Sequence, residues 1–279
     1  MNPFVSPQWL ADHLADPQVV VVDASWHLPN AGRDAKAEYR TRHIPGAVHF
    51  DIDAVADASS SLPHMLPDAQ TFGAMVGKLG IGSDQTIVVY DSVGLFSAPR
   101  VWWSLVAMGA RDVRILEGGL PAWRAQGLPV ESGETTRPPA AFAARLDPGR
   151  IADRATVLAA LEGPTPIVDA RPAIRFAGGA PEPRPGLRAG HIPGSLNLPF
   201  ASLIEDGRLR PRDELVAALR DAGVPTTEPS ITSCGSGVSA AILALAFEIA
   251  GAPPARVYDG SWAEWGREDE GTPVETGQQ

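Results

Sequence analysis

The stretch ITSCGSGVSAAILALAFEIAG, residues 231–251, places a cysteine in a glycine-rich turn between a β-branched run and a long apolar segment. Residues 231–233 predict a strand, and residues 239–250 predict a buried helix that ends at Gly251. Cys234 then lies at the carboxyl end of a strand, where parallel α/β sheets place their ligands and where backbone N–H groups and a helix N-terminus favour a thiolate. The stretch therefore predicts an α/β fold with a reactive cysteine rather than an inert buried one.

Outward from this loop, the chain contains two copies of one pattern. The tripeptide VDA at residues 22–24 recurs at 168–170, and the tetrapeptide HIPG at residues 43–46 recurs at 191–194. Asp91 in the first copy stands at the position that the cysteine takes in the second. Collinear matches of this kind indicate a duplicated domain rather than a short-period repeat. Only the second copy can perform thiol chemistry.

Each copy alternates strand patterns with helix patterns, which is typical of a parallel sheet flanked by helices. Strands are predicted at residues 19–22, 47–50, 87–90 and 113–116 in the first copy and at 166–168, 195–198, 231–233 and 256–258 in the second. Helices are predicted at residues 71–79, 99–108, 213–222 and 239–250. The fold class is α/β, with two tandem domains.

A boundary between the two copies is predicted in a polar stretch that is rich in proline. Residues 131–140 read ESGETTRPPA and show no periodicity, as expected for a linker. We expect an N-terminal domain over residues 1–132, a linker over 133–140 and a C-terminal domain with the cysteine over 141–279.

Composition narrows the class of protein. The 279 residues fit about two ordinary domains, and 44% hydrophobic with 20% charged residues is typical of a globular chain. The formal net charge of −10 disfavours binding to nucleic acid or to an anionic membrane surface. The apolar run over residues 240–250 contains Glu248 and is shorter than the ~18 residues that a membrane span needs.

The single cysteine excludes an internal disulfide and every metal site that needs several cysteines, and it favours a reducing compartment. The histidines lack metal-ligand spacing, and neither a dinucleotide fingerprint nor a Walker loop is present, so we expect no metal and no cofactor. Residues 1–14 lack the features of a signal or transit peptide, which predicts the cytoplasm. We expect a monomer, because a tandem pair already provides the usual domain–domain contact.

Seven further motifs accompany the cysteine loop. They are VDASW (22–26), RHIPGA (42–47), PHMLP (63–67), SAPRVWW (97–103), VDARPAIRF (168–176), EPRPGLRAGHIPGS (182–195) and YDGSWAEW (258–265). Together with CGSGVSA (234–240) they resemble the rhodanese-like sulfurtransferases with two tandem domains. Within that family the cysteine loop resembles the members that use 3-mercaptopyruvate, with Ser239 at the position of their usual threonine.

The resemblance implies a double displacement of sulfur. Cys234 takes sulfur from a small-molecule donor as a persulfide and passes it to a thiol such as thioredoxin or glutathione, or to cyanide. The resemblance implies catalytic roles for Cys234, Ser236, His43 and Asp34, and substrate-binding roles for Arg175, Arg184, Gly235, Gly237, Val238 and Ser239.

Chemistry supports these roles to different degrees. Planar guanidinium groups match a donor carboxylate in bidentate fashion, and a hydroxyl beside the cysteine could protonate the pyruvate enolate that mercaptopyruvate leaves behind. In the family a histidine relays protons to that hydroxyl, which His43 would do here with Asp34 orienting it. His191 occupies the same place as His43 in the second copy, so a structural role in the turn competes with catalysis.

Three other functions remain open. A thiosulfate sulfurtransferase shares the persulfide chemistry but carries basic residues at the two positions after the cysteine, which are Gly235 and Ser236 here. A cysteine phosphatase needs an arginine six residues after its cysteine, and that position is Ala240. A non-catalytic interaction module would be expected to lack the cysteine or its loop.

Overall fold

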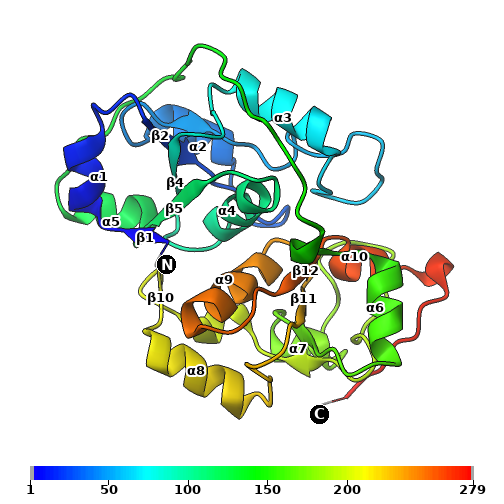
Figure 1. Ribbon diagram of the computed structural model, residues 1–279. Helices are drawn as coiled ribbons and strands as arrows, with labels where there is room; N and C mark the ends of the chain where they lie inside the picture. Colours follow the sequence, from blue (N-terminus) through cyan, green and yellow to red (C-terminus); the bar gives the residue numbers. More distant parts are fainter. Residues whose placement is uncertain (1–2, 278–279) are drawn as a thin grey trace. The chain divides into compact units, whose positions relative to one another are not determined.

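The computed structural model describes residues 3–277, and these divide into two compact units (Figure 1). The first unit takes the described residues up to Ser59, Leu66–Asp147 and Asp206–Arg208. The second takes Ser60–Met65, Pro148–Glu205 and the described residues from Leu209 onward. Each unit therefore contains a short segment from the other half of the chain.

The first unit is built on a parallel sheet of five strands in the order β1-β5-β4-β2-β3. The strands are β1 (Phe4–Val5), β2 (Val19–Asp23), β3 (Val48–His49), β4 (Thr86–Tyr90) and β5 (Asp112–Leu116). The helices are α1 (Pro7–His13), α2 (Ala35–Thr41), α3 (Ala69–Lys78), α4 (Ala98–Ala107) and α5 (Gly119–Ala125). All five residues of β2 are buried, because a strand inside a parallel sheet is covered on both faces, which explains the uninterrupted VVVV run.

The second unit repeats this architecture, with a parallel sheet in the order β6-β12-β11-β7-β8. The strands are β6 (Ile151–Ala152), β7 (Ile167–Asp169), β8 (Leu196–Asn197), β11 (Ile231–Ser233) and β12 (Arg256–Tyr258). The helices are α6 (Arg154–Leu161), α7 (Ala173–Phe176), α8 (Arg212–Asp221), α9 (Ala240–Ala250) and α10 (Ser261–Trp265). Strands β9 (Ile204–Glu205) and β10 (Arg208–Leu209) pair separately, and 3-10 turns lie at Pro148–Arg150, Phe200–Leu203 and Glu268–Glu270. The predicted fold class is confirmed.

Helix α9 is the buried helix that the sequence of residues 231–251 predicts. Nine of its residues are buried, and it ends at Gly251, whose φ of 84° lies in the left-handed region that favours glycine at a helix C-terminus. The helix follows the cysteine loop directly, so its packing fixes that loop at the carboxyl end of β11.

The polar stretch between the copies packs against the first unit. The N–H of Ala140 donates to the carbonyl of Gly77 over 2.9 Å, and the Phe142 carbonyl lies 2.6 Å from the position that a Cβ on Gly73 would take. The two glycines of α3 therefore admit this strap of backbone. The predicted linker, residues 133–140, starts against α2, where the N–H of Gly133 donates to the carbonyl of Arg40, and ends against α3 at Gly77. The first unit continues to Asp147.

Candidate active site

The cysteine loop is held in place by the start of α10. The backbone N–H of Cys234 donates to the hydroxyl of Ser261 over 3.2 Å, and its carbonyl accepts from the N–H of Trp262 over 2.9 Å. The carbonyl of Gly235 accepts from the N–H of Ala263 at the same distance. The Cys234 side chain is a free thiol that is only 2% exposed. The loop is thus a fixed cradle and not a mobile surface turn.

The remaining loop residues leave polar groups near the thiol. Gly237 adopts a φ of 78°, which turns the backbone sharply, and Val238 packs into the core behind it. Ser239 starts α9 without a capping bond from its side chain. Ser236 is buried, and among the described residues its hydroxyl has no hydrogen-bond partner, so it is available to a bound molecule.

Arg175 from α7 lies against the cysteine loop. Its Nη2 atom is 3.2 Å from the position that a Cβ on Gly235 would take. The guanidinium is oriented by Glu182, which accepts from Nε over 3.3 Å and also from Nη2. The carboxylate of a ligand would bind the N–H groups of Arg175 that are not bonded to Glu182. The structure brings Arg175 and Gly235 together, one residue from Cys234.

A buried charge network supports Arg175 from behind. Arg171 binds Asp169 through Nε and Nη2, donates to Glu182 over 2.9 Å, and lies 4.3 Å above the ring centroid of Trp262. Burial alone would lower the pKa of Arg171, but the charges and hydrogen bonds of the two acids raise it overall. Two arginines therefore share Glu182, a residue that the sequence did not single out because its role depends on charges folded around it.

Arg184 contacts a histidine that the sequence did not mark as functional. Its Nη2 atom lies 3.2 Å from Nε2 of His64, which is buried and has a φ of 60°, in the left-handed region. His64 belongs to the short segment Ser60–Met65 of the second unit. The PHMLP motif was a signal for it, although the sequence could not show which arginine the ring would meet. Arg184 also lines a cavity of about 550 Å³ in this unit, together with Arg267.

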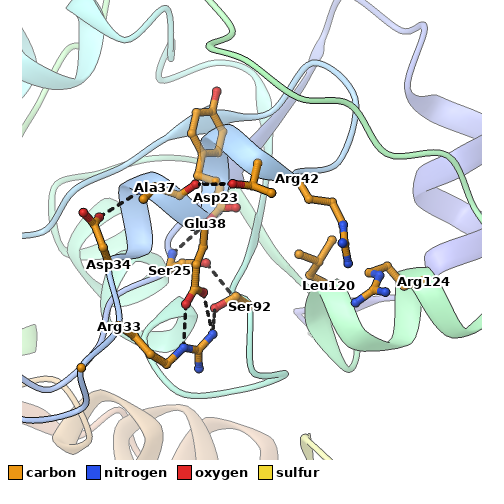
Figure 2. A pocket seen from close by; sticks show the side chains of 13 residues that line it. Asp23, Ser25, Arg33, Asp34, Ala37, Glu38, Arg42, Ser92, Leu120 and Arg124 are labelled. Carbon is orange, nitrogen blue, oxygen red and sulfur yellow. Dashed lines mark hydrogen bonds and ion pairs between the residues drawn. The ribbon is translucent and has the colours of Figure 1, made fainter.

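His43 lies in the first unit with both ring nitrogens engaged there. Nδ1 is 2.8 Å from the carbonyl of Tyr39, and Nε2 is 3.1 Å from Glu131 and 3.2 Å from the hydroxyl of Thr135. Asp34 caps α2 by accepting from the N–H of Ala37 over 3.0 Å (Figure 2). Among the described residues Asp34 is not a partner of His43, so these contacts give no support to the predicted relay pair.

The second unit holds its own histidine in the same way. His191 places Nδ1 2.8 Å from the carbonyl of Phe176 and stacks on that ring, as His43 stacks on Tyr39. Residues 129–133 (PVESG) and 273–277 (PVETG), here called the PVE segments, cross the two HIPG turns through bridges at Glu131 and Glu275. The repeated arrangement favours a structural role for both HIPG histidines.

The first unit has a carboxylate where the second has its thiol. One oxygen of Asp91 accepts from the N–H groups of Phe96, Ser97 and Ala98 at 2.6, 3.0 and 3.0 Å, and the other accepts from Val93 at 3.0 Å. The loop after β4 is therefore an anion cradle that is filled by the protein's own side chain. It has no nucleophile for sulfur transfer.

No helix among residues 3–277 is long and apolar enough to cross a membrane. Within the same residues, no group of three or more His, Cys, Asp or Glu side chains is arranged to hold a metal ion.

The parallel-sheet units and the cysteine cradle agree with the comparisons to known proteins. The rhodanese-like domain family matches residues 6–126 and 153–268, so the chain belongs to this family, in two tandem copies. The 3-mercaptopyruvate sulfurtransferase of Escherichia coli (strain K12) is 45% identical over 265 residues, which cover 94% of each chain. The thiosulfate sulfurtransferase of Rattus norvegicus is 42% identical over 272 residues, covering 94% of this chain and 91% of that protein. The crystal structure of SseA from Escherichia coli, a 3-mercaptopyruvate sulfurtransferase, matches with a TM-score of 0.87 and 43% identity over 95% of this chain and 100% of that one.

Proposed function

We propose that this protein is a sulfurtransferase that takes sulfur from 3-mercaptopyruvate through a persulfide on Cys234. It releases pyruvate and passes the sulfur to a thiol or to cyanide. The observation that carries the proposal is the guanidinium of Arg175 lying against Gly235, one residue from the nucleophile. Similarity to the E. coli 3-mercaptopyruvate sulfurtransferase along most of the chain supports the same donor.

The reaction transfers one sulfur atom in two displacements. The Cys234 thiolate attacks the donor sulfur, so that an S–S bond forms while the C–S bond breaks and its electron pair remains on carbon as the enolate of pyruvate. The proton of the donor thiol balances the protonation of that enolate. An acceptor thiolate, or cyanide, then attacks the outer sulfur and regenerates the Cys234 thiolate.

The neighbouring groups take roles that their chemistry suits. Arg175 and Arg184 bind the donor carboxylate and keto oxygen, because guanidinium groups make charge-assisted hydrogen bonds to both. The hydroxyl of Ser236 delivers the proton to the enolate carbon. The imidazole that we assign to the site is His64 instead of His43, since His64 contacts Arg184 whereas His43 is engaged by its own turn.

Gly235 favours mercaptopyruvate over thiosulfate. A basic side chain at this position would meet Nη2 of Arg175, because even a Cβ would lie only 3.2 Å from that atom. Thiosulfate, a dianion, would lack the cations that thiosulfate-selective loops provide beside the cysteine. Sequence identity alone does not separate the two donors, since the rat thiosulfate sulfurtransferase is 42% identical.

The acceptor and the setting follow from the thiol chemistry. We propose thioredoxin or glutathione as the acceptor in a reducing cytoplasm, because a lone reactive thiol needs such surroundings to stay reduced. We also propose that the enzyme acts as a monomer, with the second unit carrying the chemistry.

The test compares the two donors on the wild type and on Cys234→Ser. Intact-mass analysis after incubation with mercaptopyruvate should find one added sulfur on the wild type and none on the variant. Pyruvate formation should greatly exceed thiocyanate formation from thiosulfate and cyanide at equal donor concentrations. Sulfur transfer by Cys234→Ser would overturn the mechanism, and equal use of thiosulfate would overturn the donor assignment.

A further inference from the structure

The first unit contains a pocket of about 440 Å³ at the carboxyl end of β2 (Figure 2). Its wall includes Asp23, the last residue of β2, and Ser25, which follows two residues later. The mechanism proposed above uses none of the residues that line this pocket. The pocket lies in the copy that has no cysteine.

The internal repeat identifies what occupies the same place in the second unit. Asp23 accepts from the N–H of Ser25 over 2.9 Å, and Asp169 accepts in the same way from the N–H of Arg171 over 2.8 Å. Each aspartate also ends the strand that pairs with the strand before the cradle loop. Ser25 therefore stands where the second unit has Arg171.

In the second unit this place is filled by a guanidinium. The Arg171 side chain is 1% exposed, binds Asp169 and Glu182, and is stacked on Trp262. In the first unit the residue equivalent to Trp262 is Leu120. The N–H of Trp262 donates to the carbonyl of Cys234, and the N–H of Leu120 donates to the carbonyl of Asp91. The smaller side chains of Ser25 and Leu120 leave space, which Asp23 lines. Its carboxyl accepts from Ser25 and from the hydroxyl of Tyr90, both of them uncharged, and has no guanidinium partner among the described residues.

Two cations line the same pocket without an acidic partner. Arg33 is paired with Glu38 over 2.6 Å. Arg42 and Arg124, by contrast, form no ion pair with any described residue. In Figure 2 both guanidinium groups lie on the Leu120 side of the pocket. The pocket thus combines a buried carboxyl group with two unmatched guanidinium groups.

We propose that this pocket binds a small zwitterion of the amino-acid class. The cationic group of the ligand occupies the place of the Arg171 guanidinium and pairs with Asp23, while its carboxylate is held by Arg42 and Arg124. A ligand with only one of the two charges would leave either Asp23, whose hydrogen-bond partners Ser25 and Tyr90 are uncharged, or the arginine pair without an opposite charge. The site is independent of sulfur transfer.

The test uses L-arginine as the probe, because its guanidinium reproduces that of Arg171. Agmatine provides the guanidinium without the carboxylate, and butyrate provides the carboxylate without a cation. Isothermal titration of the full chain should give an affinity for L-arginine at least tenfold higher than for either partial ligand. Equal affinity for agmatine or butyrate, or no binding of L-arginine, would refute a zwitterion site.

Variants locate the binding. Arg124→Ala removes an exposed side chain and should weaken L-arginine binding at least tenfold while leaving kcat/KM for sulfur transfer unchanged. Asp23→Asn keeps the shape and the bond from Ser25 and should weaken it by a similar factor. Arg111→Ala, an exposed arginine outside the pocket, is the matched control. Undiminished binding by Arg124→Ala would place L-arginine elsewhere on the protein and overturn the assignment, whatever the outcome for the cysteine.

Discussion

Arg175 is bonded to Glu182 through part of its guanidinium, and its remaining N–H groups are the ones that a donor would bind. Glu182 fixes the guanidinium beside Gly235. Charge-assisted hydrogen bonds contribute roughly 1.5–3 kcal/mol, so Arg175→Ala should lower kcat/KM for mercaptopyruvate by about tenfold to a hundredfold or more. Arg175→Lys should recover only part of this, because one ammonium cannot replace the planar fork. An unchanged kcat/KM for Arg175→Ala beside a reduced one for Arg184→Ala would move the role to Arg184.

Asp23 makes a prediction about pH. Its burial raises the pKa of its carboxyl, although hydrogen bonds from Ser25 and Tyr90 oppose the shift. The folded state therefore binds this proton more tightly than the unfolded state does. As pH rises from 3.8, the ordinary pKa of the carboxyl, through the raised pKa, the contribution of Asp23 to the free energy of unfolding decreases. Asp23→Asn should then gain free energy of unfolding relative to the wild type as pH rises over that window. Urea unfolding across pH checks this, and a difference that shrinks with rising pH would contradict it.

Side chains differ in how far the sequence could reveal them. Cys234 and Arg175 lie in short motifs whose residues are close along the chain, so the local pattern is enough to single them out as candidates. His64 meets Arg184 from 120 residues away, and only the folded backbone brings the two together. His43 was the more visible histidine because of its HIPG motif, but its partners Glu131 and Thr135 lie 88 and 92 residues away in sequence.

Among the elements, the loop after β4 depends on one carboxylate. Asp91 is buried and accepts four backbone N–H groups, which an asparagine amide could not all satisfy. Asp91→Asn should reduce the free energy of unfolding by at least about 2 kcal/mol, because buried hydrogen bonds to a charged group are lost. Chemical denaturation measures this, with the exposed Asp84→Asn as control. A loss below about 0.5 kcal/mol would mean that the carboxylate does not hold the loop.

The PVE segments give a matched pair of variants. Glu131 accepts from Gly46 N–H over 2.8 Å and lies 3.1 Å from His43, whereas Glu275 lies 3.3 Å from Gly194 N and 3.9 Å from His191. Glu131→Gln should therefore lower the free energy of unfolding by about 0.5–1.5 kcal/mol at neutral pH, and Glu275→Gln should lower it less.

The same contacts set a pH dependence for this element. Partial burial raises the pKa of Glu131, but the hydrogen bonds from Gly46, Thr135 and His43 outweigh it and lower the pKa below 4.5. The stabilisation is present above that value and disappears as pH falls through the lowered pKa. The difference between wild type and Glu131→Gln in urea unfolding should vanish in acid. A difference that persists there would assign the effect to packing instead of charge.

Element prediction succeeded where a pattern is long. The apolar strands β2 and β4 and the helices α3, α4, α8 and α9 were predicted to within a few residues. Strands β1 and β6 have two residues each, too few for any periodicity, and form only because a neighbouring strand offers hydrogen bonds. The stretch over residues 133–140 has a linker's composition, yet Gly77 in α3 and Gly80 just after it allow residues 137–140 to pack closely.

For the whole molecule, we expect that cutting the chain after Asp147 does not release a fully active second unit. A fragment of residues 148–279 lacks Ser60–Met65, which carries His64 and part of the wall of the cavity beside Arg184. Its kcat/KM for mercaptopyruvate should fall at least tenfold even if it folds, because Arg184 loses a partner. Circular dichroism separates misfolding from lost activity. A folded fragment with full activity would refute a need for the segment.

The tip of the β9–β10 hairpin, residues 206–208, belongs to the first unit, where Gly207 approaches Gly94 so closely that neither could carry a side chain without displacing the other backbone. During synthesis this tip leaves the ribosome well after Asp147, by roughly three to twelve seconds at about 5–20 residues per second. The nascent first unit must wait that long, with the loop after β4 uncovered, for its last few residues. A chaperone that binds nascent chains would act during this interval. The two units would then complete their folding together instead of one after the other.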